Sequence, residues 1–200
     1  MIKGLRKELE QFLRDILITG HPRSGTGYCA KLLQHNGLDV PHEKIGGMGT
    51  SNWQFAVDSK NVPYTFDGIQ PVQCQFIHRT QVVREPVKCI ASVFYTEHAS
   101  ESFRDGYLML TGNRMERAVR SVITWNLLHK DRADLIFKLE QPEQLLEYLS
   151  LHGYLNEYEV LTEPVNTRQH EELDLDMIRY WVSPEIYGNL LNFIAWYKRI

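Results

Sequence analysis

The sequence predicts an α/β protein, a three-layer α/β/α sandwich built around a mainly parallel sheet. Short β-branched runs alternate with helical patterns along the chain, as in sheets whose parallel strands are joined by crossover helices. The first run, residues 16–19, is apolar and ends at Gly20, which is typical of a buried parallel strand. The 200 residues contain no repeat and no linker, so we expect one domain spanning residues 1–200.

The first half of the chain supplies the elements around this strand. A helical pattern covers residues 1–15, and a second helix is expected over residues 26–35, where Asn36-Gly37 forms a stop signal. Residues 38–40 are expected to form a short second strand. Residues 46–71 are rich in Gly, Ser, Asn and Pro and are predicted to be a loop with little regular structure.

The second half continues the alternation. Residues 75–84 are predicted to form a third strand, and Pro86 is expected to open a helix at its first position. A long helix over residues 113–133 and a fourth strand over residues 135–139 follow. Pro142 then begins a further helix, and three more helical stretches are expected in the C-terminal quarter.

Composition narrows the class of protein. The hydrophobic fraction of 43% and the charged fraction of 24% are those of an ordinary soluble protein, and the formal charge of −3 argues against a nucleic-acid partner. No apolar run approaches the roughly 20 residues of a membrane span, and the charged N-terminus does not resemble a signal peptide. Cys29, Cys74 and Cys89 lack metal-ligand spacing and are expected to be reduced core thiols. We therefore expect a cytoplasmic protein without a membrane span or a metal site.

A glycine-rich segment joins the first strand to the next helix. Its residues are Gly20, His21, Pro22, Arg23, Ser24, Gly25, Thr26 and Gly27. At such a junction backbone N–H groups and the helix N-terminus form an anion site. Arg23 adds a positive fork suited to phosphate or sulfate oxygens, and the hydroxyls of Ser24 and Thr26 are further donors. The segment therefore predicts a phosphate- or sulfate-binding loop of the general P-loop kind.

The loop lacks two parts of a nucleoside-triphosphate loop. Such a loop ends in Gly-Lys-Ser/Thr, with the Lys on the phosphates and the hydroxyl on magnesium. Here Gly25 is followed by Thr26 and Gly27, so the Lys and the magnesium ligand are both missing. The fourth strand is followed by Glu140, a poor substitute for the Asp that holds the metal. The sequence thus disfavours a metal-dependent kinase or ATPase.

Two motifs, each at a strand–helix junction, point to a particular chemistry. Pro22-Arg23-Ser24-Gly25-Thr26 resembles the 5′-phosphosulfate loop of sulfotransferases that use 3′-phosphoadenosine 5′-phosphosulfate. Val83-Arg84-Glu85-Pro86, with Ser92 eight residues after the Arg, resembles the 3′-phosphate site of the same family. The resemblance covers most of residues 16–137 and implies metal-independent binding of this nucleotide by the loop through Gly27, with Arg84 and Ser92 on its 3′-phosphate. It further implies that Asn166 and Arg168 close over the 3′-phosphate.

Transfer to a hydroxyl needs a group that takes the proton of the acceptor. His42 and Glu43 follow the expected second strand and should lie at the ligand edge of the sheet. Because the resemblance places a Glu in this segment of several carbohydrate and protein-tyrosine sulfotransferases, Glu43 is the first candidate base and His42 the second. If the chain stays extended, the two side chains point to opposite sides, so that only one serves.

We therefore expect a sulfotransferase that moves a sulfuryl group from 3′-phosphoadenosine 5′-phosphosulfate to an acceptor hydroxyl, with Arg23 and the loop amides stabilising charge on the leaving phosphate. A sugar, a lipid or a small metabolite is the expected acceptor, bound by residues 46–71 and 97–112. The chain is short for such an enzyme, so the acceptor site is either open or completed in a homo-oligomer. The alternatives are an atypical small-molecule kinase and a nucleotide-binding protein without catalytic activity.

Overall fold

A computed structural model describes residues 13–57, 74–95, 99–162 and 170–200. Four parallel strands form one sheet in the order β2-β1-β3-β4. The strands are β1 (Leu13–Gly20), β2 (Gly49–Ser51), β3 (Gln75–Val83) and β4 (Leu135–Lys138). In the register Ile18 lies opposite Ser51 on one side and Thr80 on the other. The predicted α/β fold with a parallel sheet is confirmed.

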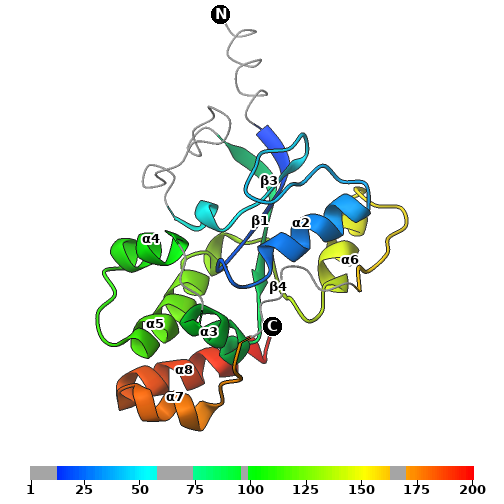
Figure 1. The fold of residues 1–200 in the computed structure, drawn as a ribbon. Helices are drawn as coiled ribbons and strands as arrows, with labels where there is room; N and C mark the ends of the chain where they lie inside the picture. The colour runs from blue at the N-terminus through cyan, green and yellow to red at the C-terminus, as the bar shows by residue number, and fades with distance from the viewer. Residues whose placement is uncertain (1–12, 58–73, 96–98, 163–169) are drawn as a thin grey trace, which may run out of the picture.

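Helices cover both faces of the sheet (Figure 1). One layer consists of α2 (Thr26–His35) and α6 (Glu143–Leu151). The other consists of α3 (Pro86–Tyr95), α4 (Ala99–Leu108) and α5 (Arg114–Leu127), with α7 (Leu175–Trp181) and α8 (Pro184–Tyr197) packed outside α5. Two short 3₁₀ turns, η1 (Trp53–Ala56) and η4 (Lys130–Arg132), complete the described elements.

The two faces bury separate cores. Ile16 and Ile18 of β1 pack with aliphatic side chains of α2 and α6, among them Leu33 and Leu146, which are fully buried. On the other side, α3, α5, α7 and α8 share a second apolar cluster around Val119. The sheet is thus held from both sides, and its strand ends are fixed in position.

The strand order reverses beside β1. The chain leaves β1 through α2 to reach β2 on one side, and leaves β3 through α3, α4 and α5 to reach β4 on the other. Connections that diverge in this way open a crevice at the carboxyl ends of the strands, where open α/β sheets bind ligands. The loops that follow β1 and β3 meet at this crevice.

The second strand was predicted in the wrong place. Leu38 and Val40 are buried in the core, but the backbone turns there, with the N–H of Val40 donating to the carbonyl of Leu38. Residues 49–51 pair with β1 instead, inside the segment predicted to be a loop, and η1 follows them. A Gly-Thr-Ser strand has no apolar alternation by which the sequence could reveal it. The rest of that predicted loop, residues 58–71, lies outside the described residues.

Other boundaries also differ from the prediction. Leu13 to Asp15 belong to β1 rather than to a helix, and β3 ends one residue before Arg84. The long helix begins as predicted, because Asn113 and Glu116 form a capping box, but it ends at Leu127. Residues 99–108, expected to be part of an acceptor loop, form α4. The C-terminal quarter contains α7 and α8 in its described part.

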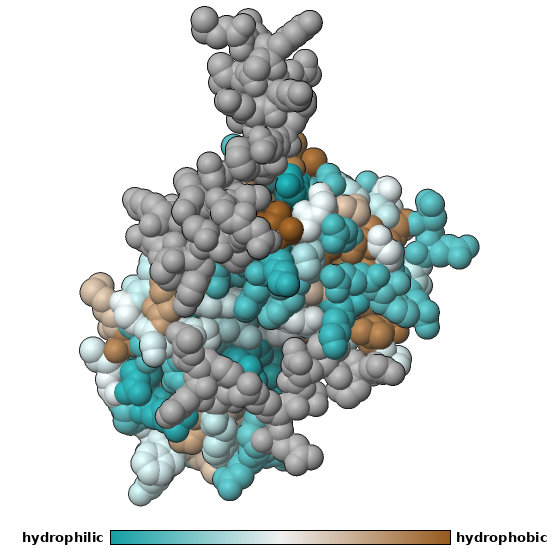
Figure 2. Space-filling view, turned by 45° about the horizontal axis from the view of Figure 1, so that its top comes forward, coloured by the Kyte–Doolittle hydropathy of each residue, from teal (hydrophilic) through white to brown (hydrophobic). Residues whose placement is uncertain are grey.

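The described surface is mixed in polarity. On the side shown in Figure 2, hydrophobic residues occur in separate spots between hydrophilic ones. Within the described residues, no helix combines the length and the apolar character that crossing a bilayer would require.

Candidate functional site

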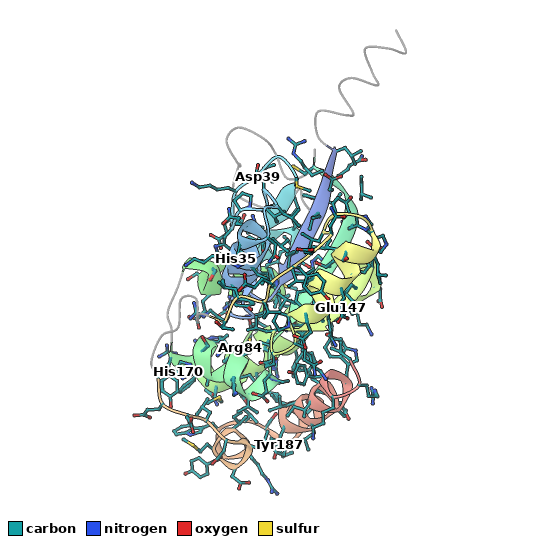
Figure 3. The ribbon with its side chains drawn as sticks, turned by 90° about the vertical axis from the view of Figure 1, so that its right-hand side faces the viewer. His35, Asp39, Arg84, Glu147, His170 and Tyr187 are labelled. Carbon is teal, nitrogen blue, oxygen red and sulfur yellow. The ribbon has the colours of Figure 1, made fainter. Side chains whose placement is uncertain are left out.

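A cleft of about 1220 Å³ lies at the carboxyl ends of β1 and β3, between α2 and α3. Its lining includes most of the predicted site residues, namely Pro22, Arg23, Gly25, Thr26, Gly27, His42, Arg84 and Ser92. In Figure 3, Arg84 lies in the middle of the molecule, between the layer of α2 and the C-terminal helices. The structure therefore brings the loop after β1 and the motif after β3 to one site.

The loop presents backbone donors to this cleft. Gly25 precedes α2 with φ of 96°, a left-handed conformation that glycine adopts without strain, and a Cβ there would overlap the side chain of Leu139. The first helical hydrogen bond runs from the N–H of Cys29 to the carbonyl of Gly25, so the N–H groups of Thr26 to Tyr28 have no partner within the helix. An anion at this helix N-terminus would satisfy them.

Arg23 is connected to both sides of the cleft. Its Nε donates to the hydroxyl of Ser92 in α3 at 2.9 Å, and its carbonyl accepts from the guanidinium of Arg84 at 3.3 Å. The two sequence motifs are therefore joined by hydrogen bonds, across 69 and 61 residues of chain respectively. The contact places the Arg23 side chain between the loop and α3.

Ser24 was predicted to donate its hydroxyl to the ligand, but its side chain does not face the cleft. Its side chain is fully buried, and its hydroxyl donates to the carbonyl of His21 at 2.7 Å. The Ser24 hydroxyl thus braces the turn from within. The Thr26 hydroxyl, by contrast, lies 3.1 Å from Nε2 of His42.

His42 and Glu43 lie side by side rather than on opposite sides. Glu43 has φ of 54°, so the chain is not extended there, and its Oε1 is 3.8 Å from Nε2 of His42. The same carboxylate oxygen accepts a hydrogen bond of 2.7 Å from the indole of Trp53. Partial burial lowers the pKa of His42, and the negative charge of Glu43 opposes this shift. A mainly neutral imidazole therefore lines the cleft, and the Glu43 carboxylate and the Thr26 hydroxyl both lie near its Nε2.

Three guanidinium groups lie near the buried thiol of Cys89, and two of them, Arg23 and Arg84, line the cleft. Arg84, Arg104 and Arg23 each act electrostatically on the buried thiol of Cys89, although burial prevails and raises its pKa to about 12. Arg104 comes from α4 and is 2% exposed. Arg23, Arg84 and Lys88 line the cleft, but Glu85, Glu140 and Glu172 line it as well. An anion would therefore be bound by individual guanidinium groups and by the N–H groups at the start of α2, not by a net positive charge of the lining.

Glu140 follows the fourth strand, where a nucleoside-triphosphate site has its metal-holding Asp. Both of its carboxylate oxygens already accept hydrogen bonds from other residues. One carboxylate oxygen accepts from the N–H of Glu85 at 3.0 Å, and the other accepts from the hydroxyl of Tyr197 at 2.8 Å. In the described part of the chain, no group of three or more His, Cys, Asp or Glu side chains has the arrangement of a metal site.

The cleft has further walls that the sequence did not suggest. Tyr28 lines it beside residues 160–162, and its hydroxyl donates to the carbonyl of Leu161 at 2.7 Å. Lys88 lines it on the first turns of α3, and His170 lines it from the segment before α7. Tyr28 directly follows the glycine-rich loop, which was the available signal, whereas His170 is distant in sequence. Asn166 and Arg168 lie outside the described residues.

Comparison with known proteins gave no relative of this chain: no family model, no curated protein and no solved structure matches it.

Proposed function

We propose that the cleft binds 3′-phosphoadenosine 5′-phosphosulfate and that the protein transfers the sulfuryl group to an acceptor hydroxyl. The observation that carries the proposal is the hydrogen bond between Arg23 and Ser92. It joins the loop suited to a 5′-phosphosulfate to the motif suited to a 3′-phosphate, at the switch point of a parallel sheet.

The nucleotide has anionic groups at the 3′ and 5′ positions of its ribose, and the cleft offers donors for both. The free N–H groups at the start of α2, together with Arg23, suit the 5′-phosphosulfate. Arg84 and Ser92, with Lys88 beside them on α3, suit the 3′-phosphate. The apolar and aromatic wall formed by Tyr28, residues 160–161 and Leu139 suits the base.

The geometry favours His42 over Glu43 as the group that takes the proton. His42 lines the cleft and is mainly neutral, so its Nε2 accepts the proton of an acceptor hydroxyl that replaces the hydroxyl of Thr26. The Glu43 carboxylate, 3.8 Å from Nε2, then stabilises the imidazolium that forms. This order reverses the preference that the sequence suggested for Glu43.

In the proposed step the acceptor oxygen forms a bond to sulfur while the bond from sulfur to the 5′-phosphate oxygen breaks. The proton moves from the acceptor to His42, and negative charge grows on the leaving phosphate. Arg23 and the N–H groups of α2 are placed to stabilise that charge. The products are a sulfate ester and adenosine 3′,5′-bisphosphate.

Calorimetry with adenosine 3′,5′-bisphosphate and with AMP tests the binding half of the proposal. A charge-assisted contact is worth about 1.5–3 kcal/mol, so the bisphosphate should bind more than roughly tenfold tighter. Equal affinities would remove the 3′-phosphate site.

Transfer from the phosphosulfate nucleotide to a panel of hydroxyl acceptors, in excess chelator, tests the catalytic half. Activity that requires magnesium and ATP would instead identify a kinase. Tight binding of the bisphosphate without transfer to any acceptor would identify a binding protein.

A further inference from the structure

The turn of the phosphate loop is built around one fully buried residue, His21. Its carbonyl accepts from the N–H of Ser24 at 2.8 Å and from the Ser24 hydroxyl at 2.7 Å. Its ring atom Nδ1 accepts from the N–H of Arg23 at 3.2 Å. Three donors of the loop thus converge on one residue, and two of the bonds fix the backbone on either side of the Arg23 side chain.

These contacts define the tautomer of the ring. Because Nδ1 accepts the Arg23 N–H, it carries no proton, and in a neutral imidazole the proton is then on Nε2. Nε2 lies 3.1 Å from the hydroxyl oxygen of Ser121 in α5, to which it donates. The thiol of Cys89 in α3, 3.8 Å from Nδ1, is a second donor to the same ring atom.

A buried cation lies on the far side of Ser121. The Nε of Arg104 donates to the same hydroxyl oxygen at 3.0 Å, so this oxygen accepts from both residues. NH1 of Arg104 has no hydrogen-bond partner among the residues that the structure describes. Burial, together with the charges of Arg104 and Arg23, holds the pKa of His21 well below its usual value. Positive charges on two elements therefore oppose protonation of the ring.

We propose that His21 is a positioning residue of the phosphate loop, whose Nδ1 holds the Arg23 amide while Ser121 and Arg104 lock the ring in the tautomer that makes this possible. The hydrogen bonds from Arg104 of α4 to Ser121 of α5, and from there to His21, thereby fix the position of the Arg23 backbone amide. With the amide turned inward, the Arg23 guanidinium reaches Ser92 and the cleft. The contacts of His21 do not depend on the proposed function. Only the measurement of bisphosphate binding does.

The bond from a ring atom of residue 21 to the amide of residue 23 has a familiar counterpart. In an Asx turn the side-chain oxygen of Asn or Asp accepts from the N–H two residues later. The Asn oxygen can replace Nδ1, whereas the longer Gln side chain places its amide near Nε2. His21→Asn and His21→Gln are therefore a matched pair that separates the two ends of the ring.

The first test uses the native protein without ligand. Nitrogen-15 NMR of the His21 ring at pH 7 should show Nδ1 without a proton and Nε2 protonated. A proton on Nδ1 at this pH would overturn the proposal.

The second test compares the two variants. Hydrogen exchange of the Arg23 amide should remain slow in His21→Asn and become fast in His21→Gln. Adenosine 3′,5′-bisphosphate should bind His21→Gln roughly tenfold more weakly than His21→Asn, the size expected for one lost loop contact. Equal exchange rates and equal affinities in two folded variants would contradict the proposal. If the native protein does not bind the bisphosphate, the proposed function fails, and the exchange rates and the NMR spectrum still decide the role of His21.

Discussion

The two faces of the sheet bury different kinds of side chain. The face covered by α2 and α6 buries Ile16, Ile18 and a set of leucines against one another. The face covered by α3, α4 and α5 also has an apolar cluster, but next to the cleft it buries His21, Arg104 and other polar side chains. Both faces thus contribute an apolar core, and the face covered by α3, α4 and α5 adds a buried polar network next to the cleft.

The face covered by α3, α4 and α5, which we call the polar face, buries polar groups at a cost in stability. Gln81, Arg104, Trp125 and His129 each bury a polar atom with no hydrogen-bond partner within the described parts of the chain. Leaving such a group unsatisfied costs about 1–3 kcal/mol. Buried polar groups of this kind fix one arrangement when their partners are present. Of the four residues, Arg104 is connected through Ser121 to His21 of the loop, so part of this cost accompanies the network that holds the loop.

The largest expected effect concerns His42, which lines the cleft. His42→Gln should lower the rate of sulfuryl transfer by ~10²–10⁴, because the proposed base is lost. The variant should bind adenosine 3′,5′-bisphosphate almost normally. Steady-state rates and calorimetry check this, and a larger loss in Glu43→Gln would return the role of base to Glu43.

The pH profile of the same variants sharpens the test. The transfer rate should fall as the pH drops through the lowered pKa of His42, since only the neutral imidazole accepts a proton. Glu43 raises this pKa, so Glu43→Gln should move the acid limb of the profile to lower pH. An acid limb that moves to higher pH would contradict the pairing.

The next effect concerns the charge that the polar face presents. Arg23→Ala should lower turnover by ~10²–10³, the cost of removing one preorganised donor at developing charge. The fold should persist, because the side chain contacts Ser92 and the cleft rather than the apolar clusters. Arg199→Ala, at an exposed position near the C-terminus, is the control. Near-normal turnover of Arg23→Ala would make its guanidinium irrelevant to transfer.

Two buried substitutions, one in the aliphatic core and one in the polar network, then test the comparison between the faces directly. Leu146→Ala in the aliphatic core should lower the free energy of unfolding by about 2–5 kcal/mol and leave the affinity for the bisphosphate unchanged. Ser121→Ala leaves two buried donors unpaired, each at a cost of about 1–3 kcal/mol, so it should lower the free energy of unfolding by about 2–6 kcal/mol and also weaken binding. Denaturant titrations and calorimetry measure both quantities. If the two variants affected affinity equally, the comparison between the faces would not hold.

The parts of the site that short local motifs determine could be predicted from the sequence. The glycine-rich loop and the Arg84–Pro86 junction were found because each is a short motif between a strand and a helix, and the cleft brings them together. The network of His21, Ser121 and Arg104 could not be predicted in this way, since His21 and Ser121 are 100 residues apart. A buried Arg also contradicts the usual preference of that residue for the surface.

The relation between His42 and Glu43 was missed for a different reason. The alternation of an extended chain places neighbours on opposite sides, but the positive φ of Glu43 turns both side chains toward each other. Such a conformation is uncommon outside glycine and has no clear signature in the sequence. Tertiary contacts, here with Trp53, decide it.

The last expected effect is the acid sensitivity of the polar face. His129 is buried just after the C-terminal end of α5, and burial, followed by the charges of Arg132 and Arg79, lowers its pKa to about 4. The unfolded chain, with an ordinary His pKa near 6.5, binds a proton between these two values that the folded protein does not bind. The free energy of unfolding is therefore independent of this group above pH 6.5 and falls by up to ~1.4 kcal/mol per pH unit as the pH drops toward 4.

His129→Gln should reduce that slope, because the substituted side chain does not titrate. Leu146→Ala is the matched control, since it should lower stability at every pH without changing the slope. His21 contributes to the slope as well, because its pKa is also lowered, so part of the acid sensitivity should remain in His129→Gln.

Denaturant titrations at intervals from pH 4 to pH 8 measure the slope for the native protein and the two variants. A native protein whose stability did not change over this range would show that the polar face does not bury its imidazoles in the neutral form. A slope that Leu146→Ala changed as much as His129→Gln would remove the distinction between the two faces.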